Sequence, residues 1–303
     1  MSRSAAVGHF PQVVVLNGKK WLFNPVLKKR YENRPEERVR LRWVEYLLLE
    51  AGWKRTRIAF EAPVRLRQQQ HSLRADLILY DEALSPNILI ECKSDSAVLN
   101  QAVAEQAGRY NSEVNAGTLI LTNGMQDFCF SRREESFVKT DLPFSAGVQQ
   151  WRTRPGYWSA RGFCPTMLDQ EKSWLTAVLT QFWSTNEAPH YLDVKLNEVI
   201  PASHYYRLFS FSGRESLAIT FAGYGGSESW MLALLNQQDR SYQALVVSLS
   251  RLMEHHPENS QLFHEGGAER LDLRSSLFLP ITGNSDHISD FLENLPQKIR
   301  SFF

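Results

Sequence analysis

Along roughly the first 140 residues, apolar side chains recur in an order that predicts a mixed α/β domain. Two β-rich runs, residues 13–16 and 19–23, flank Asn17-Gly18, and an Asn-Gly pair favours the tight turn of a β-hairpin. A helix is predicted over 35–51, because proline suits a first helical turn and apolar residues then recur at helical spacing. The chain therefore begins with a hairpin followed by an amphipathic helix.

The rest of this half predicts five strands and one more helix. The strands are expected at 57–67, 73–80, 87–93, 118–122 and 127–131, and the helix at about 97–114. The expected order is hairpin, helix, three strands, helix and two strands, in a domain that covers residues 1–145.

A loop-rich segment over 146–165, with Arg-Pro-Gly and two further glycines, is predicted to link this domain to a second one. The second domain, over 166–303, is expected to be a smaller α+β accessory domain of unknown role. Its predicted helices lie near 169–184 and 285–300, and its predicted strands at 205–211, 216–221, 230–236 and 242–249.

Composition adds that the chain is an ordinary globular protein of 303 residues, with 43% apolar and 22% charged side chains. No window approaches the ~18 uninterrupted apolar residues of a membrane span. The first residues lack the apolar core of a secretory signal, which predicts a cytoplasmic protein without a membrane partner. The three cysteines form no C-x-x-C pair, so we expect them reduced and buried.

The charge of the chain is uneven. Residues 1–155 carry 23 Lys and Arg against 17 Asp and Glu, a balance of +6, and the remainder carries 11 against 16, or −5. A basic half beside an acidic half is a weak indication of polyanion binding, and basic side chains that simply face solvent explain it equally well. The candidate DNA contacts are the basic residues before, along and after the first helix, Lys28, Lys29, Arg30, Arg38, Arg42 and Arg74, with Arg40 in the same cluster.

Three charged residues interrupt the apolar strands 73–80 and 87–93. Glu91 and Lys93 project to the same side of their strand, and Asp76 lies fifteen positions before Glu91 across one short connection. Antiparallel pairing of the two strands would bring Asp76 close to Glu91, giving two hard oxygen ligands for Mg²⁺ and one ammonium group. The alternative is an exposed ion pair between Glu91 and Lys93 on a solvated strand face.

Three more positions are candidates for the same site. Glu36 lies on the apolar face of the first helix, either as a helix-dipole partner or as a third metal ligand. Gln106 and Tyr110 lie four residues apart on the second helix, either as a core tyrosine with an amide neighbour or as a polar pair facing the site.

Five motifs in order resemble the N-terminal nuclease domain of type I restriction enzyme R subunits, over about residues 13–135. They are Asn24-Pro25 with the basic run that leads to Arg34-Pro35-Glu36-Glu37-Arg38-Val39-Arg40, then Arg74-Ala75-Asp76, Ile88-Leu89-Ile90-Glu91-Cys92-Lys93, Gln106-Ala107-Gly108-Arg109-Tyr110-Asn111 and Leu121-Thr122-Asn123-Gly124.

This resemblance implies the restriction-endonuclease-like PD-(D/E)XK fold, a mixed sheet flanked by helices, and a Mg²⁺-dependent DNA endonuclease in which Mn²⁺ can substitute. Asp76, Glu91 and Glu36 (or Glu37) would hold the metal. Lys93 would be the catalytic lysine, and Gln106 and Tyr110 would match the family's Q-x-x-x-Y element. Ala75 replaces the proline of the family name. The alternative is a catalytically silent protein with this fold that acts in DNA binding or assembly.

The resemblance does not extend to a motor. No G-x-x-x-x-G-K-[ST] phosphate loop occurs in the sequence, so we expect a stand-alone relative with no ATP site. The second domain carries no motif that assigns a role, and a homodimer or contacts with other subunits through it are further expectations.

Overall fold

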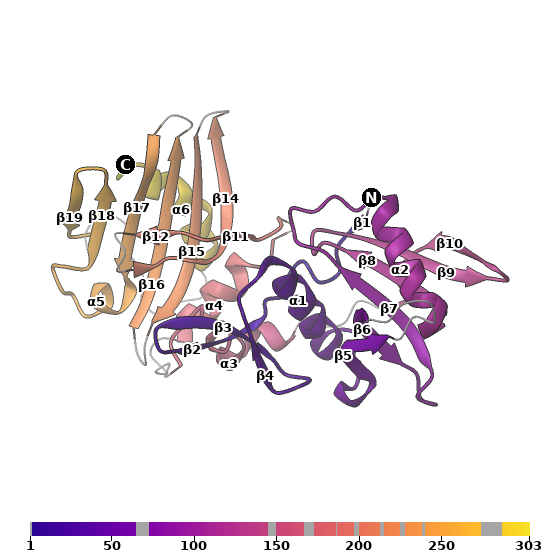
Figure 1. The fold of residues 1–303 in the computed structure, drawn as a ribbon. Helices are drawn as coiled ribbons and strands as arrows, with labels where there is room; N and C mark the ends of the chain where they lie inside the picture. Colours follow the sequence, from indigo (N-terminus) through magenta and orange to yellow (C-terminus); the bar gives the residue numbers. More distant parts are fainter. Residues whose placement is uncertain are drawn as a thin grey trace. The chain divides into compact units, whose positions relative to one another are not determined.

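The first of two structural units is built on a seven-stranded mixed sheet, seen in a computed structural model (Figure 1). The structure describes residues 2–64, 73–144, 150–166, 173–185, 187–196, 200–212, 215–224, 228–237, 240–273 and 287–303. The units are Met1–Gln149 and Gln150–Phe303, and each is described by itself.

The strand order of the first sheet is β1-β9-β8-β7-β6-β5, with β10 paired to β9. The strands are β1 (Ser2–Arg3), β5 (Ile58–Val64), β6 (Leu73–Tyr80), β7 (Pro86–Cys92), β8 (Thr118–Thr122), β9 (Gln126–Arg133) and β10 (Ser136–Thr140). Strands β7 and β8 run parallel, while the other paired strands are antiparallel. The predicted mixed α/β domain is confirmed. Residues 65–67 of the predicted strand 57–67 lie outside the described residues.

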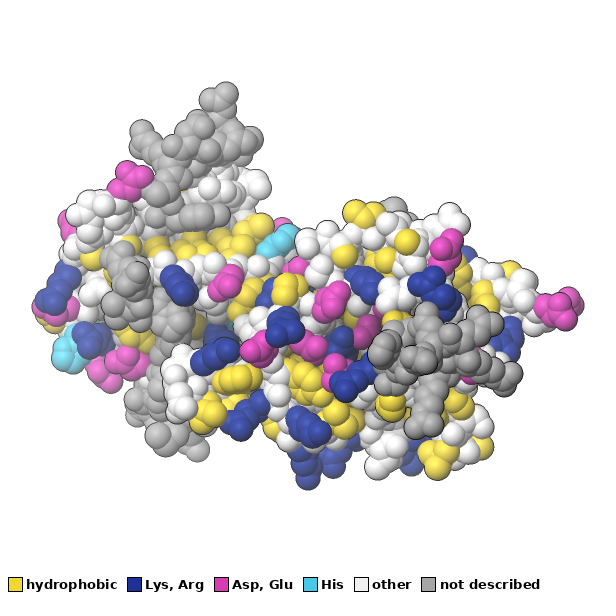
Figure 2. Space-filling model, viewed as in Figure 1, with side chains coloured by type: hydrophobic (Ala, Val, Ile, Leu, Met, Phe, Trp, Pro, Cys, Tyr) yellow, Lys and Arg dark blue, Asp and Glu magenta, His cyan; other side chains and the backbone are white. Residues whose placement is uncertain are grey.

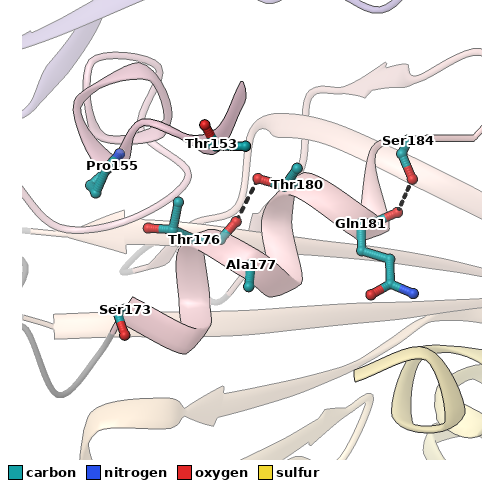
Figure 3. A pocket seen from close by; sticks show the side chains of 8 residues that line it. All are labelled: Thr153, Pro155, Ser173, Thr176, Ala177, Thr180, Gln181 and Ser184. Carbon is teal, nitrogen blue, oxygen red and sulfur yellow. Dashed lines mark hydrogen bonds between the residues drawn. The ribbon is translucent and has the colours of Figure 1, made fainter. Parts of the chain in front are cut away.

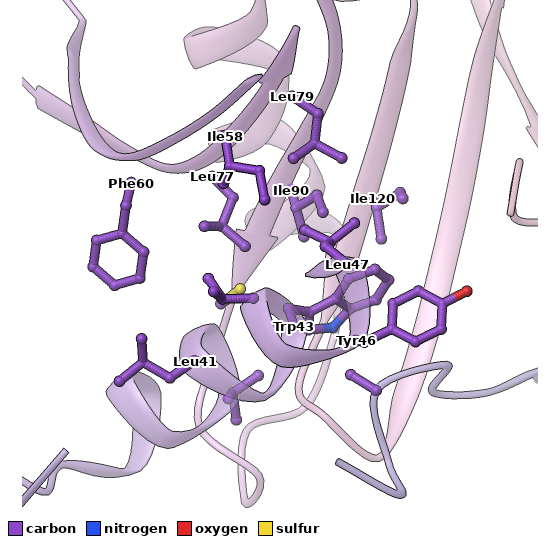
Figure 4. Packing of buried hydrophobic residues seen from close by; sticks show 14 of the residues in the cluster. Leu41, Trp43, Tyr46, Leu47, Ile58, Phe60, Leu77, Leu79, Ile90 and Ile120 are labelled. Carbon is purple, nitrogen blue, oxygen red and sulfur yellow. The ribbon is translucent and has the colours of Figure 1, made fainter. Parts of the chain in front are cut away.

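Helix α1 (Pro35–Leu49) covers one face of this sheet. Pro35 occupies its first turn, and its buried stripe includes Trp43 and Leu47, which pack against apolar side chains of β5, β6, β7 and β8 (Figure 4). Burying each such side chain contributes about 1.5–3 kcal/mol, so this cluster fixes α1 on the sheet.

Helix α2 (Gln101–Val114) contributes Tyr110 to a second apolar cluster, with Ile78 of β6 and Leu89 of β7. The helix begins four residues later than predicted, because the side chain of Asn100 accepts a hydrogen bond from the backbone N–H of Val103 and caps it. It ends at Asn115, which has the left-handed backbone conformation of a helix C-terminus.

A separate three-stranded antiparallel sheet contains the predicted hairpin. Strands β2 (Gln12–Leu16) and β3 (Lys19–Asn24) meet at Asn17-Gly18, both with positive φ, as predicted for this turn. The short strand β4 (Lys29–Tyr31), which the sequence did not predict, pairs with β3. Leu22 of β3 is fully buried in the α1 cluster and anchors the small sheet.

The second unit contains a seven-stranded antiparallel sheet of order β11-β14-β15-β16-β17-β18-β19 (Figure 1). Its strands are β11 (His190–Leu192), β14 (His204–Ser212), β15 (Glu215–Tyr224), β16 (Glu228–Gln237), β17 (Arg240–Ser248), β18 (Ser260–His264) and β19 (Gly267–Leu271). A two-stranded pair is formed by β12 (Lys195–Leu196) and β13 (Ile200–Pro201).

The described helical segments of this unit are η2 (Gln150–Thr153), α3 (Pro155–Ser159), α4 (Ser173–Phe182), α5 (Leu249–Met253) and α6 (Ile288–Arg300). The parts of the predicted helices at 169–172 and 285–286 lie outside the described residues. The α+β prediction agrees with these elements, but the unit, residues 150–303, is not smaller than the first.

The predicted linker over 146–165 is wrong for residues 150–165. Trp151, Trp158 and Phe163 of this segment are buried, and the indole N–H of Trp158 donates to the carbonyl of Arg152. The two glycines and two prolines of this stretch favour a loop, but the aromatic side chains near them are buried in the second unit. Residues 145–149 lie outside the described residues.

Two further predictions from the sequence concern the cysteines and membrane-spanning helices. All three cysteines are free and buried, as expected. In the part of the chain that the structure describes, none of the helices combines the length and the apolar character needed to cross a membrane.

Candidate active site

Glu91 and Lys93 form an ion pair at the C-terminal end of β7. The Nζ atom of Lys93 lies 2.9 Å from Oε1 of Glu91, as the shared strand face predicts. Glu91 is only 2% exposed, whereas Lys93 is half-buried. The second oxygen of Glu91, Oε2, is buried and has no hydrogen-bond partner among the described residues. A buried carboxylate with one unpaired oxygen is costly unless something else binds it, so the exposed ion pair is the wrong alternative.

Asp76 joins this site from the neighbouring strand. The predicted antiparallel pairing of β6 and β7 is confirmed, with Leu77 opposite Ile90. Immediately beyond that pair, Oδ2 of Asp76 accepts a hydrogen bond of 2.7 Å from the backbone N–H of Cys92. The carboxylate of Asp76, 8% exposed, is thereby held against the end of β7 that also carries Glu91.

Arg40 of α1 closes the site on another side. Its guanidinium lies 2.6 Å from Oδ1 of Asp76, 2.7 Å from Oε1 of Glu37 and 3.3 Å from Oε1 of Glu61. The side chain of Arg40 therefore connects three secondary-structure elements, α1, β5 and β6, beside Asp76.

The electrostatics follow from burial and from this crowding of charge. Burial raises the pKa of Glu91 to about 7, and the negative charge of Asp76 acts in the same direction. Burial also raises the pKa of Asp76, against the opposing charge of Arg40, and the pKa of Glu37. Burial alone would lower the pKa of Lys93, but its hydrogen bond to Glu91 outweighs that effect and raises it. A perturbed carboxylate pair beside an ammonium group is typical of a functional site.

Glu36 lies at the edge of the site and is exposed. Its charge raises the pKa of both Asp76 and Lys93, although it forms no ion pair or hydrogen bond with another described side chain. The neighbouring acid, Glu37, is the one bound to Arg40. The two acids that begin α1 are thus divided between an exposed position and a buried ion pair.

Gln106 and Tyr110 bind each other. The side-chain amide of Gln106 donates to the hydroxyl of Tyr110 at 3.0 Å, and the ring of Tyr110 is buried in the α2 cluster. Within the described residues, neither makes a hydrogen bond to Asp76, Glu91 or Lys93. A role for this pair in the site stays a prediction.

The six predicted DNA-contact residues occupy different environments. Lys28, Lys29 and Arg30 are exposed at the turn between β3 and β4 and on β4 itself. Arg74 of β6 is also exposed, and its guanidinium lies 3.8 Å from Glu61. Figure 2 shows Lys and Arg side chains interspersed with apolar ones on the face of the molecule that it presents.

Two of the predicted DNA-contact residues, Arg38 and Arg42 of α1, are less exposed than the other four. Arg38 is half-buried and donates to Oδ1 of Asn33 at 3.1 Å. The prediction for Arg42 is wrong, because its side chain is 2% exposed and donates to the backbone carbonyl of Val7. The segment before β2 covers the side of α1 that a helical wheel assigns to solvent.

The roles of Arg40 and Glu61 are not predicted by the sequence pattern. Arg40 was predicted only as one of a cluster of surface cations, although its three-residue spacing from Glu37 suits an ion pair on a helix. Glu61 occupies a polar position of an alternating strand and gave no signal. Its φ of 51° in the middle of β5 is a conformation that few side chains adopt, and such strain concentrates at functional sites.

No group of three or more His, Cys, Asp or Glu side chains within the described residues is arranged as a ready metal cage. Mg²⁺ often uses only one or two carboxylates and keeps several water molecules. The unpaired Oε2 of Glu91 beside Asp76 fits a site of that open kind.

The second unit contains a cavity of about 530 Å³ between α4 and the preceding helical segments (Figure 3). It is lined by Thr153, Pro155, Ser173, Thr176, Ala177, Thr180, Gln181 and Ser184. The hydroxyls of Thr180 and Ser184 donate to backbone carbonyls of their own helix. These lining residues carry no charged group, and we assign no chemistry to the cavity.

Residues 35–142 match the family model of the type I restriction enzyme R protein N terminus. The matched segment runs from the first residue of α1 to just beyond β10, and it includes Asp76, Glu91 and Lys93. This match confirms the resemblance identified from the sequence. The chain matches no curated protein and no solved structure.

Proposed function

We propose that the first unit is a PD-(D/E)XK nuclease domain that hydrolyses phosphodiester bonds of DNA with the help of Mg²⁺. The observation that carries this proposal is the pair formed by Glu91, buried with one oxygen unpaired, and Lys93, whose ammonium group is bound to the other oxygen. The family of residues 35–142 supports a nuclease-type function. The arrangement of helix, three antiparallel strands, helix and parallel strand in this segment agrees with the proposed fold.

Asp76 and Glu91 would hold the metal, with Glu36 contributing charge from the edge of the site. Both carboxylates are nearly buried and supply the hard oxygen atoms that Mg²⁺ prefers. A Mg²⁺ ion held there would supply positive charge to neutralise the phosphate and would lower the pKa of a water molecule.

Lys93 would orient the nucleophilic water and stabilise the negative charge that develops on the phosphate. Its ammonium group keeps its proton because the hydrogen bond to Glu91 raises its pKa. The side chain is half-buried, so it can face both Glu91 and a bound substrate. Fixed positive charge in a partly desolvated site is an effective way to stabilise such a transition state.

The DNA itself would be held mainly by exposed basic side chains. Lys28, Lys29, Arg30 and Arg74 are the candidates that remain accessible for phosphate contacts. Such contacts set the affinity and position of the duplex but carry no base sequence information.

A plasmid-nicking assay with the full chain and Mg²⁺ tests the proposal. We expect the wild type to nick supercoiled DNA, and Asp76→Asn, Glu91→Gln and Lys93→Ala to lose at least about a hundredfold in rate, as loss of transition-state stabilisation predicts. Matched controls are Glu135→Gln and Lys54→Ala, both exposed and remote along the chain from these motifs. A Lys93→Ala variant that nicks at the wild-type rate contradicts the catalytic assignment.

One observation favours a second candidate, a DNA-binding or assembly protein without turnover. Both oxygens of Asp76 already have protein partners, Arg40 and the backbone N–H of Cys92. A silent protein would bind DNA but would show no rise in melting temperature on addition of Mn²⁺. A metal-binding site raises the melting temperature by mass action, which separates the two candidates.

A further inference from the structure

Arg40 is almost completely enclosed by acidic and aromatic side chains. It is 7% exposed, and its two terminal nitrogens divide the neighbouring carboxylates between them. Nη1 contacts Glu37 and Glu61, while Nη2 contacts Asp76. The guanidinium also lies 5.3 Å from the ring centre of Phe60. These contacts leave the side chain little freedom.

Glu61, a residue of β5 with a strained backbone, takes part in these contacts of Arg40. Glu61 adopts φ of 51° within β5, and its carboxylate contacts Arg40 and accepts a hydrogen bond from the hydroxyl of Tyr31. A non-glycine residue in this conformation costs about 1–3 kcal/mol and persists only where its surroundings hold it. The contacts of Glu61 with Arg40 and Tyr31 supply such a restraint.

We infer that Arg40 is a positioning residue that gives Asp76 a fixed positive neighbour, and that the site consequently binds one divalent ion and not two. This inference rests on the proposed nuclease function. Two-metal sites hold their ions about 3.5–4 Å apart on shared carboxylates. Here Oδ1 of Asp76 is bound by a guanidinium that also binds Glu37 and Glu61, and its departure would remove the ion-pair partner of Glu37.

The balance of charge supports a single ion. In their ionised forms, the buried or half-buried carboxylates of Glu37, Glu61, Asp76 and Glu91 carry −4, and Arg40 and Lys93 carry +2, which leaves −2. One divalent ion neutralises that remainder. Glu36 adds a weaker negative charge from the exposed edge of the site, where solvent screens it.

Arg40 stays charged throughout. Burial alone would lower its pKa, but the charges of Asp76 and Glu37 outweigh burial and raise it. An arginine also differs from a lysine here, because its planar fork can bind two or more carboxylate oxygens at once, whereas an ammonium group is a point charge. Replacement by lysine should therefore keep the charge and lose the alignment of Asp76.

Mn²⁺ binding to the full chain without DNA tests the inference, with free Mn²⁺ followed by electron paramagnetic resonance. We expect one tightly bound ion per wild-type chain, lost in Asp76→Asn. In Arg40→Met, we expect a second ion to bind and the Mn²⁺-induced rise in melting temperature to exceed that of the wild type. In Arg40→Lys, we expect one ion with an affinity at least about fivefold weaker. The matched control is Arg57→Met, which removes an arginine that pairs with exposed Glu82 and with none of the carboxylates around Arg40.

The outcomes separate the two proposals. Two ions in the wild type, both lost in Asp76→Asn, overturn the inference, as do unchanged stoichiometry and melting shift in Arg40→Met. If Arg40→Met folds only when Mn²⁺ is present, the inference is supported. If Arg40→Met does not fold at all, Arg40→Lys decides, and an unchanged Mn²⁺ affinity of that variant overturns the inference. A wild type that binds one ion but does not cut DNA contradicts only the proposed function. A wild type that binds no Mn²⁺ contradicts both the metal site and the role of Arg40.

Discussion

The indole N–H of Trp43 donates a hydrogen bond of 2.9 Å to the hydroxyl of Thr122, which ties α1 to the end of β8 across 79 residues of chain. Both side chains are fully buried. The same hydroxyl accepts a hydrogen bond from the backbone N–H of Gly124 and donates one to the carboxylate of Asp127. One hydroxyl group therefore joins a helix, a strand and the following turn beside the candidate active site.

Thr122→Val should destabilise the first unit, because valine has nearly the same shape but cannot form any of these bonds. Each buried polar group left unpaired costs about 1–3 kcal/mol, so we expect the free energy of unfolding to fall by about 2–4 kcal/mol. Thr118→Val is the matched control on the same strand, and it should change that free energy by less than about 0.5 kcal/mol. Urea unfolding of both variants measures the difference, and equal losses would contradict the role given to Thr122.

The metal-free protein should lose stability as the pH rises from about 4.5 to 7. Burial raises the pKa of Glu91 from its ordinary 4.5 to about 7, so over this interval the folded state retains a proton that the unfolded state has released. Deprotonation of the folded state then costs on the order of 1–3 kcal/mol.

Glu91→Gln removes this cost. We expect its free energy of unfolding, measured in EDTA, to fall less than that of the wild type between pH 5 and pH 7.5. The exposed variant Glu135→Gln should follow the wild type. Parallel pH profiles for wild type and Glu91→Gln would show that the surroundings of Glu91 do not favour its protonated form.

The sequence predicted those parts of the fold that repeat a local pattern. Helix α1 was predicted because Pro35 and the spacing of Trp43 and Leu47 are local signals, and the position of Glu91 beside Lys93 follows from strand alternation alone. The strands that were missed, such as β4 and β10, are short or largely exposed and have no apolar alternation to detect.

The errors at the site have a different origin. Arg42 is buried by the segment that precedes β2, which has no periodic pattern and could not be placed from the sequence. The function of Arg40 depends on Glu61, whose positive φ interrupts the regular course of β5. Contacts between residues far apart in sequence determine both the burial of Arg42 and the ion pairs of Arg40. A helical wheel contains no information about such contacts.

Gly223→Ala should destabilise the second unit strongly. Gly223 lies on β15 and donates its backbone N–H to the carbonyl of Gly162, and a Cβ atom added to it would lie only 2.2 Å from the carbonyl carbon of Cys164. The contacted atoms belong to the backbone, so relief requires the strand or the 162–165 segment to move. We expect a loss of about 3 kcal/mol or more, at the upper end for overpacked sites.

Gly156→Ala is the control for this variant, since an added Cβ meets no atom within 4 Å there and alanine favours the helix. Amide hydrogen exchange of β15 measures the effect within the second unit. Equal protection in the two variants would mean that the close approach between Gly223 and Cys164 does not hold in solution.

Lys28, Lys29 and Arg30 should account for part of the salt dependence of DNA binding. Each phosphate that is no longer neutralised makes the slope of log K against log[salt] less steep by about 0.9, so replacing all three by Gln should reduce the slope by up to about 2.7. The three residues are exposed, whereas Arg42 is buried and contributes nothing to this salt dependence.

Fluorescence anisotropy of a labelled duplex, in EDTA to prevent cleavage, gives the slope for each protein. The matched triple variant replaces the exposed Arg154, Arg251 and Lys298 of the second unit by Gln, with the same change in net charge. If both triple variants change the slope equally, net charge alone governs binding and the β3–β4 region does not contact DNA.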